Sequence, residues 1–211
     1  MQRGLARMRS IQRILFVAAF SLAGCSTLDV FVPSTGTMHD AHPVTRTDPG
    51  DRALVVLLRP SYFGAIYSLR VVDENGMFVA DVPAHAHASV LLPAGKHTFT
   101  MLAREIEIMV SPKNVLWANL GAGRVYFVYV DVSLGDGPYL AAIGPRSEHW
   151  SEVREWLADT GGLAPNADAL GKSVMGGRDV MDEALLRGKR LSPDERAERT
   201  LLLEDGIQPH W

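Results

Sequence analysis

The sequence predicts a mainly β protein: an antiparallel β-sandwich followed by a C-terminal α-helical extension. Two patterns indicate this class. Between residues 52 and 145, short apolar runs are separated by turns rich in Gly, Pro and Asn, as in an all-β sandwich rather than in alternating strands and helices. After residue 145, apolar residues instead recur every three or four positions, which is the period of an amphipathic helix.

The first strand should be covered on both faces. Its residues, 53–58, are continuously apolar and are bounded by Gly50-Asp51 and Arg59-Pro60. The full set of expected strands is 53–58, 65–72, 77–80, 88–92, 97–102, 105–110, 115–120, 125–130 and 139–143.

Two hairpins are expected among these strands. Asn75-Gly76 separates the second and third runs, and this pair tolerates the positive φ angles of a type I′ turn. The fourth and fifth runs flank the turn-forming stretch Pro93-Ala94-Gly95-Lys96. In the strand that follows, His97 shares a face with Phe99 and Met101.

Two short motifs in this region resemble those of a known family. They are Leu92-Pro93-Ala94-Gly95-Lys96-His97 and Ala122-Gly123-Arg124, the latter followed by Tyr126 and Phe127. They are similar to a bacterial lipoprotein domain family of unknown function, with a Pro-Gly-x-His type hairpin and a Gly-Lys-x-Tyr-Tyr type strand, and to PEGA-like β-sandwich modules. Here Ala94 is an extra residue and Arg124 stands in place of Lys. The resemblance implies an immunoglobulin-like or transthyretin-like fold and brings no catalytic residues.

The first helix of the extension is expected to begin after Ser147. Trp150, Val153, Trp156 and Leu157 recur on one face, and a Gly-Gly pair ends the helix. Two tryptophans on one helical face more often pack against a sheet than bind a ligand. If they are exposed instead, Trp150 and Trp156 would form an interaction surface.

Two more helices are predicted. One is expected over residues 178–187, after a loop that is rich in Gly, Ala and Asn. The other has a capping box, with Ser192 as cap and Glu195 three residues later, and should extend to Gly206. Its apolar positions are Ala197, Leu201 and Leu202.

The N-terminal 24 residues have the pattern of an export signal. Four arginines and no acidic residue precede an apolar run at residues 14–20. The run leads to Leu22-Ala23-Gly24-Cys25, which resembles the lipobox of bacterial lipoproteins. The resemblance implies cleavage between Gly24 and Cys25 and lipidation of Cys25. A membrane-spanning anchor would need about 20 apolar residues, and a chance buried helix leaves the arginines unexplained.

Residues 25–51 are expected to be a lipidated N-terminus and a flexible tether, because they are rich in Pro, Thr and Gly. Ser26, rather than Asp, follows the cysteine. By the lipoprotein sorting rules of Gram-negative enteric bacteria, this implies an outer-membrane address facing the periplasm. The expected organisation is thus a signal peptide at 1–24, the tether at 25–51, a sandwich at 52–145 and a helical extension at 146–211.

Composition narrows the class of partner. The chain is 47% hydrophobic and 21% charged, as is typical of folded domains. Its formal charge of −3 becomes −7 once the four signal arginines are removed, so nucleic acid is not an expected partner. Cys25 is the single cysteine, which leaves no disulfide to form within the mature chain.

His85, His87 and His97 are the strongest candidates for a metal-binding site. Residues two apart on a strand point the same way, so His85 and His87 could share a metal ion, and His97 could reach it across the predicted hairpin. No acid nearer than Asp81 supports them in this hairpin. A half-exposed strand face is therefore the favoured interpretation of the three histidines.

Nothing in the sequence assembles a nucleophile, a base and an orienting group, so we expect neither an enzyme nor a cofactor. Gly171-Lys172-Ser173 resembles the end of a phosphate-binding loop, but Asn166 stands where the first glycine is required. Glu105 and Glu107 could pair as carboxylates, yet an outward strand face explains their alternation with Ile106 and Ile108.

Two functions of different classes are therefore predicted. The favoured one is a lipid-anchored cell-envelope protein that acts as a structural or adaptor module and binds an envelope protein or a cell-wall glycan. The alternative is a ligand- or metal-binding lipoprotein that uses the three strand histidines. A hydrolase ranks third.

Overall fold

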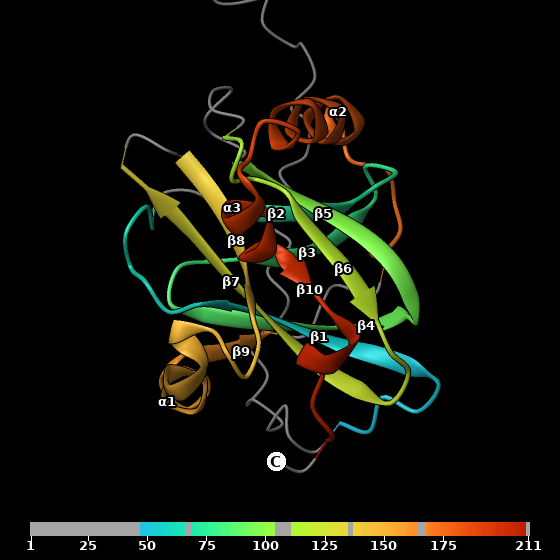
Figure 1. Cartoon of the computed structure of the whole chain (residues 1–211), viewed down its shortest axis with the longest axis vertical. Coiled ribbons are helices and arrows are strands. Elements are labelled where there is room, and N and C mark those ends of the chain that lie inside the picture. The colour runs from blue at the N-terminus through green and yellow to red at the C-terminus, as the bar shows by residue number, and fades with distance from the viewer. Residues whose placement is uncertain (1–46, 66–68, 104–110, 135–136, 164–167, 210–211) are drawn as a thin grey trace, which may run out of the picture. The chain divides into compact units, whose positions relative to one another are not determined.

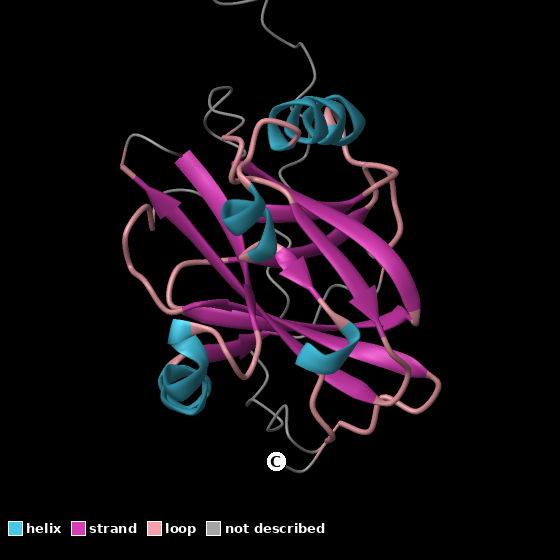
Figure 2. Cartoon of the chain, in the orientation of Figure 1, coloured by secondary structure: helices cyan, strands magenta, loops and turns pink. Residues whose placement is uncertain are grey.

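The computed structural model describes residues 47–65, 69–103, 111–134, 137–163 and 168–209. These residues form two five-stranded sheets and a few helices (Figures 1 and 2). The predicted signal peptide, Cys25 and the tether up to residue 46 lie outside the described residues. The predicted strand at 105–110, with Glu105 and Glu107, also lies outside them.

The first sheet has the strand order β8-β7-β1-β4-β9, and the second has the order β10-β6-β5-β2-β3. The strands of the first sheet are β1 (Arg52–Arg59), β4 (Ala86–Pro93), β7 (Arg124–Ser133), β8 (Gly137–Ile143) and β9 (Gly161–Leu163). Those of the second sheet are β2 (Leu69–Asp73), β3 (Phe78–Val82), β5 (Gly95–Ala103), β6 (Leu116–Leu120) and β10 (Thr200–Leu201). The helices are η2 (Glu148–Glu152), α1 (Val153–Asp159), α2 (Gly177–Gly188), α3 (Pro193–Ala197) and η3 (Leu203–Asp205).

Both sheets are mixed, which corrects the prediction of purely antiparallel pairing. β1 is antiparallel to β4 but parallel to β7. The short strands β9 and β10 join β4 and β6 in parallel. Parallel neighbours need a long crossover. Between β1 and β7 the strands β2 to β6 supply it, and the helices α1 and α3 precede β9 and β10.

The central strand β1 is buried on both faces, as its continuous apolar run predicts. Val55 and Leu57 belong to the core between the two sheets, together with Val71 and Phe99 of the second sheet. Leu54, Val56 and Leu58 face the other way and form an outer core with residues of η2 and α1. The first sheet is therefore a middle layer, with the second sheet on one face and α1 on the other.

The first predicted hairpin is confirmed, with a different turn. β2 and β3 pair antiparallel across Asn75-Gly76. Gly76 has a φ of 73°, but Asn75 does not have a positive φ, so the turn is not of type I′. The Asp73 carboxylate instead accepts hydrogen bonds from the backbone N–H groups of Asn75 and Met77 and shapes the turn.

The second predicted hairpin is wrong, because β4 and β5 lie in different sheets. Only Ala94 separates them, and Gly95 takes a φ of 132°. Val90 of β4 and Met101 of β5 then reach the same core from its two sides. The turn is thus a corner at which the chain changes sheets, as strands do at a bend in packed sheets.

The first two predicted helices are confirmed. The first begins after Ser147 as η2 and continues as α1, although the Ser147 hydroxyl donates to the Gly144 carbonyl instead of capping the helix. The second is α2, whose buried residues Met181 and Ala184 lie on the side that packs against β5 and β2.

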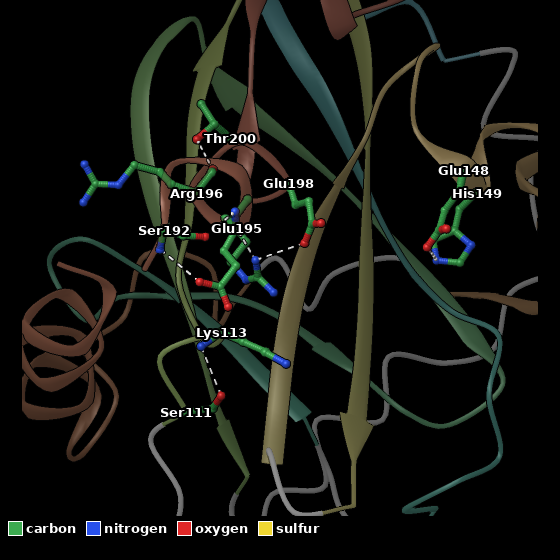
Figure 3. A network of polar contacts seen from close by, with 10 residues as sticks. Ser111, Lys113, Glu148, His149, Ser192, Glu195, Arg196, Glu198 and Thr200 are labelled. Carbon is green, nitrogen blue, oxygen red and sulfur yellow. Dashed lines mark hydrogen bonds and ion pairs between the residues drawn. The ribbon is translucent and has the colours of Figure 1, made fainter. Parts of the chain in front are cut away.

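The third predicted helix begins as expected and ends early. The capping box of Ser192 and Glu195 is present (Figure 3). Helix α3 stops at Ala197, whereas the sequence pattern extends to Gly206. The chain becomes extended at β10 because Leu201 pairs with Ala118 of β6. The Leu201 side chain is fully buried there. Ala197 and Leu202, also predicted to be buried, are exposed.

The segment after residue 145 is more than a helical extension, because it adds one strand to each sheet, β9 and β10. Its end is also paired, since Ile207 forms a β-bridge with Val125 and contributes to the outer core. None of the helices in the described parts of the chain combines the length and apolar character required to cross a bilayer.

Candidate functional site

An exposed aromatic pair follows the central strand β1. Tyr62 is 68% exposed and Phe63 is 44% exposed. Among the described residues, they are the only aromatic side chains in the set of exposed large hydrophobic residues. No charged residue occurs in the surrounding segment, residues 60–65. Adjoining exposed apolar residues, unlike ones that are scattered singly, can mark an interaction site, so this pair is the starting point of the candidate site.

The Tyr62 ring is held in one orientation by His85. The two rings stack with their centroids 4.1 Å apart and an angle of 18° between their planes. His85 covers one face of the phenol ring, and the high exposure of Tyr62 leaves the opposite face open to solvent. Tyr62 thus presents an exposed ring that is backed on one face by His85.

His85 has a hydrogen-bond partner at one ring nitrogen and an acid near the other. Its Nδ1 lies 3.0 Å from the carbonyl oxygen of Pro60, and because a carbonyl can only accept, Nδ1 carries the hydrogen. Its Nε2 faces the carboxylate of Asp159, at 3.7 Å from Oδ2. Asp159 is the last residue of α1. We call Tyr62, Phe63, His85 and Asp159 the Tyr62 platform.

The backbone of His85 adopts a conformation that is unusual for a side-chain-bearing residue. Its φ is 53°, and no other non-glycine residue in the described segments has a positive φ. Such residues persist where the surroundings hold them, and they cluster at functional sites. Here the His85 N–H donates to the Ser61 carbonyl, and the Gly161 N–H donates to the His85 carbonyl. Both bonds fix the turn that aims the imidazole at Tyr62.

A buried arginine contacts the loop that carries Tyr62 and Phe63, residues 60–65. Arg59, the last residue of β1, is 0% exposed. Its guanidinium donates to the carbonyl oxygens of Phe63 at 3.1 Å, Gly64 at 2.9 Å and Val82 at 3.1 Å. Burial lowers the pKa of Arg59, and the charge of Asp131 partly opposes this shift. An arginine remains charged at neutral pH even so, and its hydrogen bonds tie the loop to β3.

The structure does not bring the three predicted metal-binding histidines together. His87 is buried on the α1 side of the first sheet, where its Nδ1 lies 2.8 Å from the Thr160 hydroxyl. That hydroxyl donates to the Trp156 carbonyl, so His87 Nδ1 must be the donor in their contact. Burial lowers the pKa of His87.

His97 lies in the second sheet because the chain changes sheets at the corner after β4. Its Nε2 is 2.8 Å from the Pro93 carbonyl, and its ring is parallel to that of Phe99. Within the described parts of the chain, no three His, Cys, Asp or Glu side chains are grouped so that they could hold a metal ion.

Trp150 and Trp156 fasten the first helical segment to the sheet. Both are half-buried in the outer core. Trp150 meets Phe127 edge-on at 6.1 Å, and Trp156 lies 5.3 Å from Tyr129. His149 stacks on Tyr129 at 5.1 Å and also contacts Glu148 and Glu152; Glu148 and His149 are drawn in Figure 3. This packing sets the position of α1, and with it the position of Asp159.

A scan against protein-family models finds no match for this chain, and a search of curated proteins finds none either.

The sequence patterns do not mark Arg59, Tyr62 and Phe63 as candidate site residues, and they indicate only that a strand ends at Arg59-Pro60. The available signal was an uncharged stretch with two adjacent aromatic residues directly after a buried strand. That signal does not distinguish buried rings from exposed ones, because burial depends on segments that are distant in sequence.

Proposed function

We propose that the chain is a lipid-anchored cell-envelope adaptor that docks a second envelope macromolecule on the Tyr62 platform. One observation carries the proposal: an exposed tyrosine ring is clamped on one face by His85 and open on the other. Tyrosine is among the residues that dominate binding energy at interfaces. A ring that is already ordered also avoids part of the entropic cost of binding, about 0.5–1.5 kcal/mol per side chain.

The proposed cellular location is inferred from the N-terminal sequence pattern. The arginines, the short apolar run and the lipobox support attachment of Cys25 to a membrane, and Ser26 supports the periplasmic face of the outer membrane. Attachment through two or more acyl chains is stable. Residues 47–51 belong to the described turn before β1, where Pro49 is buried, so the proposed tether is residues 25–46, and a flexible chain of that length has an average span on the order of 25 Å. The folded body would then reach partners well beyond the lipid headgroups.

The finer fold class is part of the proposal. Two packed sheets around one core support the immunoglobulin-like or transthyretin-like class, although the stretch Pro93-Ala94-Gly95-Lys96 is a corner between sheets and not the hairpin of the family that the motifs resemble. The alternative function, a metal-binding lipoprotein, has less support because His85, His87 and His97 have three separate sets of contacts.

The proposal can be tested by site-specific photo-crosslinking in cells. A benzophenone amino acid is placed at Tyr62 in one variant and at Met175 in the control, since Met175 is 87% exposed and is not part of the platform. We expect a crosslinked envelope component from position 62 that is not formed from position 175. Equal products from both positions, or no product from position 62, would contradict the docking role.

A further inference from the structure

We propose that Asn75-Gly76 is a deamidation site that the fold keeps unreactive, and that it reacts when the β2–β3 turn separates from helix α2. This modification is independent of the proposed docking function. An Asn followed by Gly deamidates more readily than other Asn pairs, because glycine has no side chain to hinder attack by its own backbone nitrogen. Asn75 is exposed at the turn, so water and base reach its side chain.

The reaction joins the backbone nitrogen of Gly76 to the side-chain carbonyl carbon of Asn75. As this carbon–nitrogen bond forms, the bond from the same carbon to the amide nitrogen breaks, and ammonia leaves with the proton that Gly76 gives up. Water then opens the cyclic succinimide at one of its two carbonyls, which yields aspartate or isoaspartate. The reaction rate therefore depends on how often the Gly76 nitrogen is free to lose its proton and to approach the side chain.

In the folded chain the Gly76 nitrogen is engaged. Its N–H donates to the Asp73 carbonyl at 2.9 Å. The Asp73 carboxylate accepts the N–H groups of Asn75 and Met77, each at 2.9 Å, and these bonds fix the peptide units on both sides of the reacting pair. Attack on the Asn75 side chain requires this turn to open first. The rate of deamidation should then scale with the opened fraction.

The start of α2 packs against the same turn. Gly76 is buried, and the Val174 N–H donates to its carbonyl oxygen at 3.1 Å. A Cβ atom at Gly76 would lie 2.5 Å from the Arg178 nitrogen, and one at Gly177 would lie 2.7 Å from the Gly76 oxygen. The two backbones leave no room for the turn to rearrange, so it opens only when the start of α2 moves away.

The modified turn should not close again in the native way. Isoaspartate adds one carbon atom to the main chain, and the contact between Gly76 and Gly177 has no space for it. Either product also places a new carboxylate next to Asp73 and Glu74, where like charges repel each other. Deamidation is therefore expected to make a transient separation of α2 from the turn permanent.

The test is peptide mapping by mass spectrometry during incubation of the full chain at mildly alkaline pH, both folded and in urea. We expect Asn75 to deamidate at least about tenfold more slowly in the folded chain than in urea, because the locally opened state is a minor population. Gly177→Ala pushes the turn and α2 apart and should raise the rate in the folded chain at least about threefold. Asp73→Ala removes two hydrogen bonds from the turn and tests the same point if Gly177→Ala does not fold.

The matched control is Ser192→Ala, which weakens the cap of α3 and leaves the contacts of Gly76 intact. Its folded chain should deamidate at the wild-type rate, and Asn75→Gln should remove the signal from this peptide. The proposal is overturned if Asn75 reacts equally fast in the folded chain and in urea, or if it does not react in urea. It is also overturned if Ser192→Ala raises the rate as much as Gly177→Ala and Asp73→Ala do, because global unfolding would then control the reaction.

Discussion

Arg59 is the residue on which the shape of the Tyr62 loop depends. Replacing it with Met keeps most of the apolar length and leaves the carbonyls of Phe63, Gly64 and Val82 without their donor. We expect Arg59→Met to lower the free energy of unfolding by about 1–3 kcal/mol and to speed hydrogen exchange in the loop. Urea denaturation and exchange mass spectrometry measure the two effects.

The matched control for this substitution is Arg70→Met. Arg70 is also a strand arginine, but it pairs with Asp81 on the second sheet, at 2.8 Å. Its loss should leave exchange in the Tyr62 loop unchanged. If both variants affect the loop equally, or if neither does, Arg59 does not hold the platform in place.

His87 should make stability depend on pH. Burial lowers its pKa below the ordinary value of 6.5, so the folded protein holds this imidazole neutral. As the pH falls through 6.5, the unfolded chain takes up the proton first, and stability decreases. The contribution is therefore complete above this pH and is lost below it. We expect the thermal midpoint to fall less steeply between pH 8 and pH 5 in His87→Gln than in the wild type, whereas the control Ser151→Ala, which removes no titratable group, should follow the wild-type curve. Parallel curves for all three proteins would contradict this assignment.

Among the elements, α3 depends on its capping box. The Ser192 hydroxyl accepts from the Glu195 N–H at 3.3 Å, and the Ser192 N–H donates to the Glu195 carboxylate at 2.9 Å. Ser192→Ala removes the first bond and should cost about 0.5–2 kcal/mol of stability in urea denaturation. Ser151→Ala, at an exposed position in η2, should cost little. An equal cost at the two positions would mean that the cap does not stabilise α3.

The elements also show how far local sequence patterns extend. Apolar runs predicted the strands β1 to β8, because a run is a property of neighbouring residues, but they did not predict β9 and β10. The corner between β4 and β5 has the same Pro and Gly signals as a hairpin, and only the core that Val90 and Met101 share decides between the two. In the same way, Gly161-Gly162 correctly ended the first helix, but its role in β9 depends on pairing with β4.

The candidate site was predicted less well than the fold, for the same reason. His85 was chosen for its spacing to His87, but its positive φ removes it from that strand face and turns it towards Tyr62. The platform joins the loop after β1, the turn before β4 and the end of α1. No local sequence pattern predicts that these three segments come together.

At the scale of the whole molecule, the segment after residue 145 should be required for folding. It supplies β9, β10 and the helix that covers the outer core. A chain cut after residue 145 would expose Leu54, Val56 and Leu58, so we expect it to aggregate or to lose cooperative thermal unfolding. Removal of residues 208–211 keeps the Ile207 bridge and serves as the control. A cooperative, soluble protein ending at residue 145 would show instead that the two sheets are independent of the extension.

The proposed adaptor function requires that a lipid on Cys25 holds the chain at an envelope membrane. The most direct measurement is metabolic labelling with a palmitate analogue in the native host, with Cys25→Ser as the control, followed by the mass of the N-terminal peptide. We expect the wild type to take up the label and Cys25→Ser not to do so. We also expect the membrane fraction to contain a mature chain that begins at acylated Cys25. Unlabelled protein that retains residues 1–24 and is found in the cytosol would contradict it.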